Sequence, residues 1–291
     1  MKLSLLLAIT ISVVVPGAAQ NTSRETPPSV PASMQQMVLP SHGSMLLGVL
    51  YLAAGGEPHP TAIILHGFPG FEQNLDLAQA MRAQGWNVLA VHYRGSWGVT
   101  GDFSFLHAAE DADTEVRYLL DSENVKKYHI DPRRLIVIGH SMGGYMAASA
   151  AAHNPQVAAA VLISAWNIGA EYENGQGAST IESKAKDLAS DNNLLPLAGT
   201  SGEKLAREIY EHKSELNFNN LAPKISQRPV LIITSNDGLA PVDHSLVEAL
   251  RKAGNGRVTE RHWDTDHGYS GVRTEMEKAI LDWTKQNVTG S

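Results

Sequence analysis

A serine set between two glycines is the residue with the clearest capacity for chemistry in this chain. Gly139-His140-Ser141-Met142-Gly143 fits the pattern G-x-S-x-G, follows the apolar run 135–138 directly, and leads into the Ala-rich stretch 142–153. A tight bend between a strand and a helix projects a serine hydroxyl outward, at a helix N-terminus whose dipole favours negative charge. The pattern therefore predicts that Ser141 is a nucleophile.

The elements that must position this serine alternate between short apolar runs and longer amphipathic stretches. The predicted strands are 45–52, 61–65, 88–92, 135–138, 157–163, 229–234 and 258–263, and the predicted helices are 74–84, 108–122, 142–153, 244–253 and 273–287. Near-continuous apolar strands that alternate with helices are typical of an α/β fold, in which helices cover both faces of a mostly parallel sheet. Ligands of such sheets bind at the carboxyl ends of the strands.

One segment, from about residue 170 to 220, departs from this alternation. It is polar, has no strand-like run, and is too long for a simple connection between two strands. We expect it to form a small helical cap inserted over the strand ends, with a long surface loop as the alternative.

The serine motif and its surroundings resemble the α/β-hydrolase superfamily. The run Ile130-Asp131-Pro132-Arg133-Arg134-Leu135 resembles, more narrowly, dienelactone-hydrolase-like and prolyl-oligopeptidase-type catalytic domains. The resemblance extends over roughly residues 40–290. It implies an α/β-hydrolase fold with a catalytic serine, acid and histidine in that order along the chain. It does not specify a substrate.

The resemblance also implies two backbone N–H groups that hold the oxyanion of a tetrahedral intermediate. One belongs to Met142, the residue after the nucleophile. The run His66-Gly67-Phe68-Pro69-Gly70 follows the strand 61–65 and resembles the superfamily's oxyanion turn, which gives the Phe68 N–H as the second donor. We expect His66 to shape this turn and not to act as a base.

The acid of the triad is expected after the strand that follows the cap. Asp237 lies there, four residues before Pro241, and is the predicted acid. Asp243 is the alternative. It lies beyond Pro241, however, at the start of the next helix, where it fits a capping or first-turn carboxylate better.

The base is expected in the loop between the last strand and the final helix. Among 12 histidines, His267 occupies that place, in Asp266-His267-Gly268-Tyr269. His262 lies within the preceding strand and is expected to be structural. His140 is expected to pack at the variable position of the serine motif, and Asp264 and Asp266 are expected to be solvated.

Two aromatic residues are weaker candidates for contact with a substrate. Trp97 belongs to the run 94–98 after the strand 88–92, at the same edge of the sheet, although that run also fits a plain Gly-rich turn. Tyr172 lies at the start of the expected cap.

These residues predict acyl transfer in two steps. His267 takes the proton of Ser141, Ser141 attacks a carbonyl carbon, Asp237 orients the imidazole, and water then cleaves the acyl-enzyme. We expect hydrolysis of a carboxylic ester or a short acyl or peptidyl compound, with no metal or organic cofactor.

Two alternatives stay open. One is a peptidase or amidase of the prolyl-oligopeptidase type, although such relatives carry an N-terminal β-propeller for which the roughly twenty residues before the domain leave no space. The other is a non-catalytic binding protein on the same scaffold, which the presence of all three triad residues disfavours.

The first twenty residues are typical of a secretory signal peptide. A positive start at Lys2 precedes the apolar stretch 3–15 and small residues that allow cleavage near Ala19 or Gln20. The apolar stretch is too short to span a bilayer comfortably, so no stable membrane anchor is expected after cleavage. We therefore predict a signal peptide over 1–20, a flexible lead-in over 21–36, a hydrolase domain over 37–291, and a secreted or periplasmic location.

Composition excludes several other classes. With 43% hydrophobic and 18% charged residues, a chain of 291 residues can bury a large core without metal or disulfides, and it has no cysteine. A formal net charge of −7 argues against a nucleic-acid-binding surface, which requires clustered basic residues.

Overall fold

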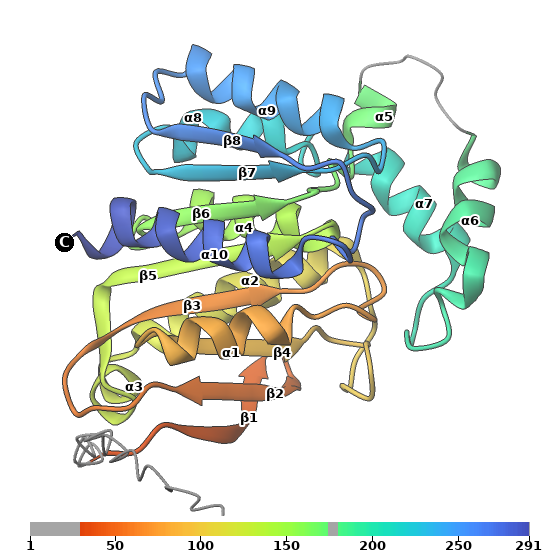
Figure 1. The fold of residues 1–291 in the computed structure, drawn as a ribbon. Helices are drawn as coiled ribbons and strands as arrows, with labels where there is room; N and C mark the ends of the chain where they lie inside the picture. Colours follow the sequence, from red (N-terminus) through yellow and green to blue (C-terminus); the bar gives the residue numbers. More distant parts are fainter. Residues whose placement is uncertain (1–29, 174–179, 291) are drawn as a thin grey trace, which may run out of the picture.

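An eight-stranded sheet forms the centre of the protein (Figure 1). The computed structural model describes residues 30–173 and 180–290. The strands lie in the order β1-β2-β4-β3-β5-β6-β7-β8, and the pairs from β4 to β8 are parallel, whereas β2 is antiparallel to both β1 and β4. Their bounds are β1 Ser33–Ser41, β2 Ser44–Leu52, β3 His59–Leu65, β4 Asn87–His92, β5 Ile130–His140, β6 Ala159–Ile163, β7 Val230–Thr234 and β8 Val258–His262.

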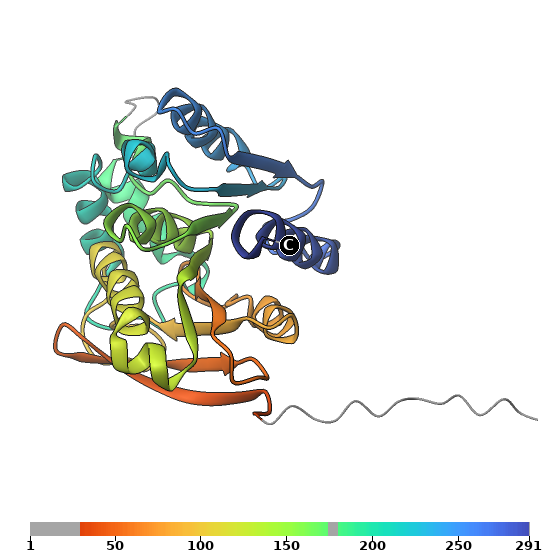
Figure 2. The ribbon, with the colours of Figure 1, turned by 90° about the vertical axis from the view of Figure 1, so that its left-hand side faces the viewer.

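Helices cover both faces of this sheet, as the alternation of the sequence predicts (Figure 2). On one face lie α1 (Leu75–Ala83) and α10 (Arg273–Thr284), and on the other lie α2 (Phe105–Leu120), α4 (Met142–His153), α8 (Ala222–Ile225) and α9 (Ala240–Lys252). The short helix α3 (Ser122–Lys127) leads into β5, and the π-helical turn η3 (Lys285–Thr289) follows α10. Every residue of β3, β6 and β7 is buried, which explains why these strands are almost continuously apolar.

The segment between β6 and β7 forms the predicted helical cap. It contains α5 (Ala170–Glu173), α6 (Ile181–Ala189), η1 (Ser190–Asn192), α7 (Gly202–Glu211) and η2 (Phe218–Leu221). In Figure 1, α6 and α7 lie beyond the carboxyl ends of the parallel strands. The Glu208 carboxylate of α7 accepts hydrogen bonds from the Phe105 and Leu106 N–H groups at 2.9 and 3.2 Å, where the positive end of the α2 dipole favours a negative charge. The cap is therefore anchored to the body of the protein.

Several boundaries differ from the sequence-based expectation, for local reasons. Strand β1, from Ser33 to Ser41, was not predicted, and it begins inside the segment expected to be a flexible lead-in. Because β1 is an edge strand with one solvated face, its exposed Gln35 and Gln36 hide the apolar alternation. Helix α9 begins at Ala240 instead of residue 244, with Pro241 in its first turn, a position that proline tolerates.

The proposed signal peptide lies outside the described residues. Within residues 30–173 and 180–290, no helix has the length and apolar character needed to cross a bilayer.

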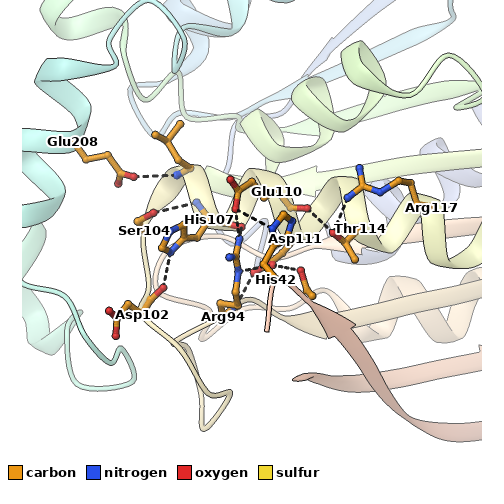
Figure 3. Close-up of polar contacts among 12 residues, drawn as sticks. His42, Arg94, Asp102, Ser104, His107, Glu110, Asp111, Thr114, Arg117 and Glu208 are labelled. Carbon is orange, nitrogen blue, oxygen red and sulfur yellow. Dashed lines mark hydrogen bonds and ion pairs between the residues drawn. The ribbon is translucent and has the colours of Figure 1, made fainter. Parts of the chain in front are cut away.

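A buried arginine ties the loop after β4 to helix α2 (Figure 3). Arg94 is 6% exposed, and its Nε donates to Asp111 Oδ1 at 2.8 Å while its Nη2 donates to Glu110 Oε2 at 2.5 Å. The Arg94 backbone N–H donates to the other Asp111 oxygen, and the Ser41 hydroxyl donates to Asp111 Oδ1 at 2.6 Å. The fully buried Asp111 carboxylate thus joins β1, the loop after β4 and α2.

Replacing Arg94 with methionine should therefore destabilise the fold strongly. The substitution leaves the buried Asp111 carboxylate without its cation, and removal of one partner of a buried ion pair costs about 3–5 kcal/mol. Urea unfolding of Arg94→Met against wild type measures this loss. The control is Lys186→Met, which breaks an exposed pair with Glu182 and should leave the midpoint almost unchanged. Equal urea midpoints for wild type and Arg94→Met would show that the Arg94–Asp111 ion pair does not stabilise the fold.

Candidate active site

Ser141 lies at the bend between β5 and α4 in a strained backbone conformation. Its φ is 57° and its ψ is −122°, values that a non-glycine residue adopts only where its surroundings enforce them. The Ser141 N–H donates to Ile163 O at 2.9 Å, and the Ser141 carbonyl accepts from the N–H groups of Gly144 and Trp166, also at 2.9 Å. Three backbone hydrogen bonds therefore fix the strained residue, one of them to the strand β6.

Glycines around Ser141 make this close packing possible. A Cβ atom on Gly139 would lie 1.8 Å from the Gly143 carbonyl oxygen, and one on Gly143 would lie 2.0 Å from the Leu65 carbonyl oxygen. A Cβ on Gly67 would lie 3.0 Å from the Ser141 Cβ and 3.5 Å from its Oγ. The turn after β3 consequently passes directly against the serine side chain.

The acid and base expected from the sequence meet at the ends of β7 and β8. His267 Nδ1 donates to Asp237 Oδ2 at 2.7 Å. The Asp237 side chain is 5% exposed, whereas that of His267 is 42% exposed. Because Nδ1 carries the bonded proton, the neutral ring has a free lone pair on Nε2, the nitrogen that can accept a proton.

A cluster of buried hydroxyls surrounds Asp237. The Ser164 hydroxyl lies 2.7 Å from the Tyr269 hydroxyl and 3.2 Å from that of Ser235. Burial alone would raise the pKa of Asp237, but hydrogen bonds from Ser164, His267 and Ser235 and from the Leu239 N–H together lower it below its ordinary value. The carboxylate is therefore ionised at neutral pH and able to stabilise a positive imidazole.

Sequence reasoning missed these hydroxyls, because their partners are distant in the chain. Ser164 directly follows β6, Ser235 directly follows β7, and Tyr269 lies two residues after His267. Ser164 and Tyr269 are fully buried with positive φ values of 41° and 58°. Strained non-glycine residues tend to cluster at functional sites. The positive φ values therefore mark Ser164 and Tyr269 as residues of the site, although no sequence motif includes them.

His140 does more than pack at the bend, which was its expected role. Its Nε2–H donates to the His267 carbonyl at 2.9 Å, and the two rings lie 4.6 Å apart. Burial lowers the pKa of His140 to about 4, so the ring stays neutral and keeps this donor geometry at physiological pH. His140 thus holds the loop that carries His267.

Asp243, the alternative candidate for the acid, lies in the first turn of α9, as its sequence position predicts, and its side chain is fully buried. Its Oδ2 accepts the Ala165 N–H at 3.1 Å. Burial raises the pKa of Asp243 well above its ordinary value, and the Asp237 charge adds to that effect. The His267 ring bonds to Asp237, and Asp243 instead fixes the backbone beside the end of β6.

The turn after β3 presents backbone N–H groups near the serine. His66 is buried and its Nδ1–H donates to Gly67 O at 2.8 Å, so it shapes the turn as expected. Burial lowers the pKa of His66 to about 3. The N–H groups of Phe68 and Met142 have no acceptor among the described residues, and Met142 is the first residue of α4. Both amides are available to an oxyanion.

The Ser141 hydroxyl makes no hydrogen bond to any residue that the structure describes. Hydrogen bonds between a catalytic nucleophile and its base are often long before substrate binds and shorten in the bound complex.

The two weaker aromatic candidates lie in different surroundings. Trp97 follows β4, and its Nε1–H donates to the Pro69 carbonyl at 2.7 Å, which joins it to the turn after β3. Tyr172 is 7% exposed in α5, where its ring packs at 5.6 Å against that of Tyr210. A substrate contact for either residue stays a prediction.

The other residues considered near the base have structural contacts. His262 bonds to Thr234 Oγ1 at 2.9 Å and to Asn236 Oδ1 at 3.1 Å. Asp264 accepts a bond from Asn236 and is largely solvated, while Asp266 accepts the Ser270 N–H at 2.9 Å.

Comparison with known proteins agrees with this architecture. A family model described as the alpha/beta hydrolase fold matches residues 60–256, which is more than half of the chain. The chain belongs to the α/β-hydrolase fold family. The mostly parallel sheet with helices on both faces is thus that of an α/β-hydrolase, as the sequence motifs predict.

Individual relatives of this α/β-hydrolase are distant. It is 28% identical over 235 residues to a multifunctional-autoprocessing repeats-in-toxin protein of Vibrio vulnificus, a match that covers 76% of this chain but 4% of the toxin. Its fold is similar to that of an esterase from Pyrococcus furiosus, with a TM-score of 0.64, 17% identity and coverage of 89% and 92% of the two chains. An acylaminoacyl peptidase from Pyrococcus horikoshii gives a TM-score of 0.64 and 19% identity over 89% of this chain and 42% of that one.

The buried histidines predict a dependence of stability on pH. The native rings of His66 and His140 resist protonation until about pH 3 and 4, whereas unfolded histidines take up protons below about pH 6.5. The unfolded chain therefore binds more protons in this window, and the free energy of unfolding should fall as the pH falls from 6.5 towards 4. Each histidine contributes about 1.4 kcal/mol per pH unit.

Urea unfolding at intervals between pH 6.5 and 5 measures this slope. The variant His140→Gln keeps an N–H donor but cannot titrate. In it, the slope of the unfolding free energy against pH should be smaller by the contribution of one histidine, about 1.4 kcal/mol per pH unit. An unchanged slope in that variant would refute a neutral, buried His140.

Proposed function

We propose that this α/β-hydrolase is a serine hydrolase that cleaves carboxylic esters through an acyl-enzyme. The observation that carries the proposal is the bond of 2.7 Å between His267 Nδ1 and Asp237, at the same edge of the sheet as the strained Ser141. The acid is buried and the base half-exposed, which is the arrangement that general-base activation of a serine needs.

In the first step, His267 Nε2 takes the Ser141 proton as Oγ attacks the substrate carbonyl carbon. The Oγ–carbon bond forms, and the carbonyl electron pair moves to oxygen. Asp237 holds the ring in the tautomer with a free Nε2 and stabilises the imidazolium that results.

The tetrahedral intermediate formed by this attack carries a negative charge on the former carbonyl oxygen, which must be stabilised. The N–H groups of Phe68 and Met142 are the proposed donors, and loss of one such donor usually lowers turnover by about 10²–10³. Collapse of the intermediate breaks the bond to the leaving alcohol, which receives the proton from His267. Water then attacks the acyl-enzyme by the same route and frees Ser141.

An ester is the preferred substrate class and an amide or peptide the alternative. Solved structures with a similar fold include esterases and an acylaminoacyl peptidase, at identities of 17–19% that indicate the fold alone. An alkoxide is a better leaving group than an amide anion. The site residues of this chain provide general acid–base catalysis and oxyanion binding, which suffice for an ester.

Replacement of Ser141 with alanine should abolish ester hydrolysis. Without the hydroxyl no acyl-enzyme forms, and turnover of p-nitrophenyl acetate should fall on the order of 10⁶-fold. Labelling by a fluorophosphonate probe should be lost in Ser141→Ala.

The matched control is Ser149→Ala, a buried serine on the same helix α4. It should retain both turnover and labelling. Full activity in folded Ser141→Ala would refute the mechanism, and faster cleavage of aminoacyl-p-nitroanilides than of esters by wild type would favour the peptidase alternative.

We also propose that the protein is exported, on the sequence of residues 1–20 alone. Mass spectrometry of protein from the culture medium or periplasm should find a mature N-terminus near residue 20. Intact Met1 in the exported fraction, or retention in the cytoplasm, would contradict export.

A further inference from the structure

An apolar cavity of about 660 Å³ lies between the loop after β4 and the cap. Phe71, Trp97 and Val99 line one side of it, and Leu195, Pro196 and Leu197 of the cap line the other. Small residues complete the lining, and none of the nine lining residues is charged.

The rim of this cavity exposes large apolar side chains to solvent. Leu195 is 80% exposed, Phe71 66% and Trp97 37%. Single exposed apolar residues are common on protein surfaces, but several exposed apolar side chains around one cavity are typical of a binding site.

Two of the residues that line the cavity, Trp97 and Phe71, adjoin the proposed oxyanion turn. Trp97 Nε1–H donates to the Pro69 carbonyl at 2.7 Å, and the Trp97 ring contacts that of Phe71 edge-on at 5.2 Å. Phe71 directly follows Gly70, the last residue of the turn. A chain bound in the cavity therefore lies beside the turn that carries the Phe68 N–H.

The two walls are fixed to each other by backbone hydrogen bonds. The Trp97 N–H donates to Pro196 O at 2.8 Å, the Ala198 N–H to Gly95 O at 2.7 Å, and the Phe103 N–H to Ala198 O at 2.9 Å. Ion pairs between Arg94 and the carboxylates of α2 anchor the base of the same loop (Figure 3). The cavity is a preformed feature, so little ordering opposes binding.

The order of the strands determines which end of a substrate this cavity meets. The leaving alcohol must take its proton from His267, which follows β8, on one side of the nucleophile strand β5. Trp97 follows β4, on the opposite side of β5. Because the leaving alcohol must lie next to His267, the acyl chain is the end of the substrate that can extend to the side of β5 on which Trp97 lies.

We propose that this cavity binds the hydrocarbon acyl chain of the substrate, so that the enzyme prefers medium-chain over acetyl esters. The proposal rests on the function proposed above. A second protein copy fits the cavity poorly, because a stable interface engages about 20–30 residues on each side and nine line this hollow.

The test compares kcat/KM for p-nitrophenyl octanoate and acetate in wild type, Leu195→Ser and Leu195→Met. Leu47→Ser is the control, since it removes the same side chain from an exposed place on β2. Each buried methylene contributes up to roughly fourfold, so wild type should prefer octanoate by about tenfold or more. That ratio should fall at least about threefold in Leu195→Ser and persist in Leu195→Met and Leu47→Ser.

Binding of free octanoate, followed by tryptophan fluorescence, tests the cavity independently of catalysis. Wild type and Leu47→Ser should bind octanoate saturably, and Leu195→Ser at least about threefold more weakly. If wild type cleaves no ester, the proposed function fails. The titration then decides by itself whether the cavity binds a hydrocarbon chain.

Three results would overturn the proposal. The first is an unchanged octanoate-to-acetate ratio in Leu195→Ser that still cleaves acetate, which would leave the serine hydrolase standing. The second is no saturable octanoate binding by wild type. The third is a wild-type dimer that Leu195→Ser dissociates, which would assign the cavity to a second copy.

Discussion

The strained backbone of Ser141 is the constraint on which the rest of the site depends. A positive φ at a residue with a side chain costs about 1–3 kcal/mol and persists only when neighbours enforce it. Here the carbonyl of Ile163 and the N–H groups of Gly144 and Trp166 do so, and Gly139 and Gly143 provide the space. The Ser141 side chain is consequently held at the carboxyl edge of the sheet, against the turn after β3, and the neighbouring His140 contacts His267.

The second constraint is the charge of Asp237, which is nearly buried and must still be ionised. Hydroxyl groups of Ser164 and Ser235 reduce the cost of burial, and Tyr269 bonds to Ser164 from the loop that also contains His267. His140 holds the same loop through the His267 carbonyl. His267, the proposed base, is therefore positioned by two contacts: Asp237 holds its ring, and the neutral His140 holds its backbone carbonyl.

Local patterns made the fold predictable and singled out the candidate site residues, whereas contacts between distant parts of the chain were not visible in the sequence. The bend at Ser141 could be recognised because strand, glycines and helix are neighbours in the chain. Asp237 and His267 followed from their positions after predicted strands, with the family resemblance as guide. Ser164 and Tyr269 could not be predicted, because their hydroxyls meet only when the loops after β6 and β8, which are distant in the chain, come together across the end of β7. The whole of β1 was missed for the opposite reason: this edge strand shows too little apolar alternation in its local sequence.

A crystal structure of the protein after reaction with a small alkyl fluorophosphonate tests the central claim most directly. The account predicts phosphorus bonded to Ser141 Oγ, the phosphoryl oxygen at about 2.7–3.1 Å from the N–H groups of Phe68 and Met142, and His267 Nε2 within hydrogen-bonding distance of the adduct. An adduct whose phosphoryl oxygen faces away from both amides, or one attached to a residue other than Ser141, would contradict it.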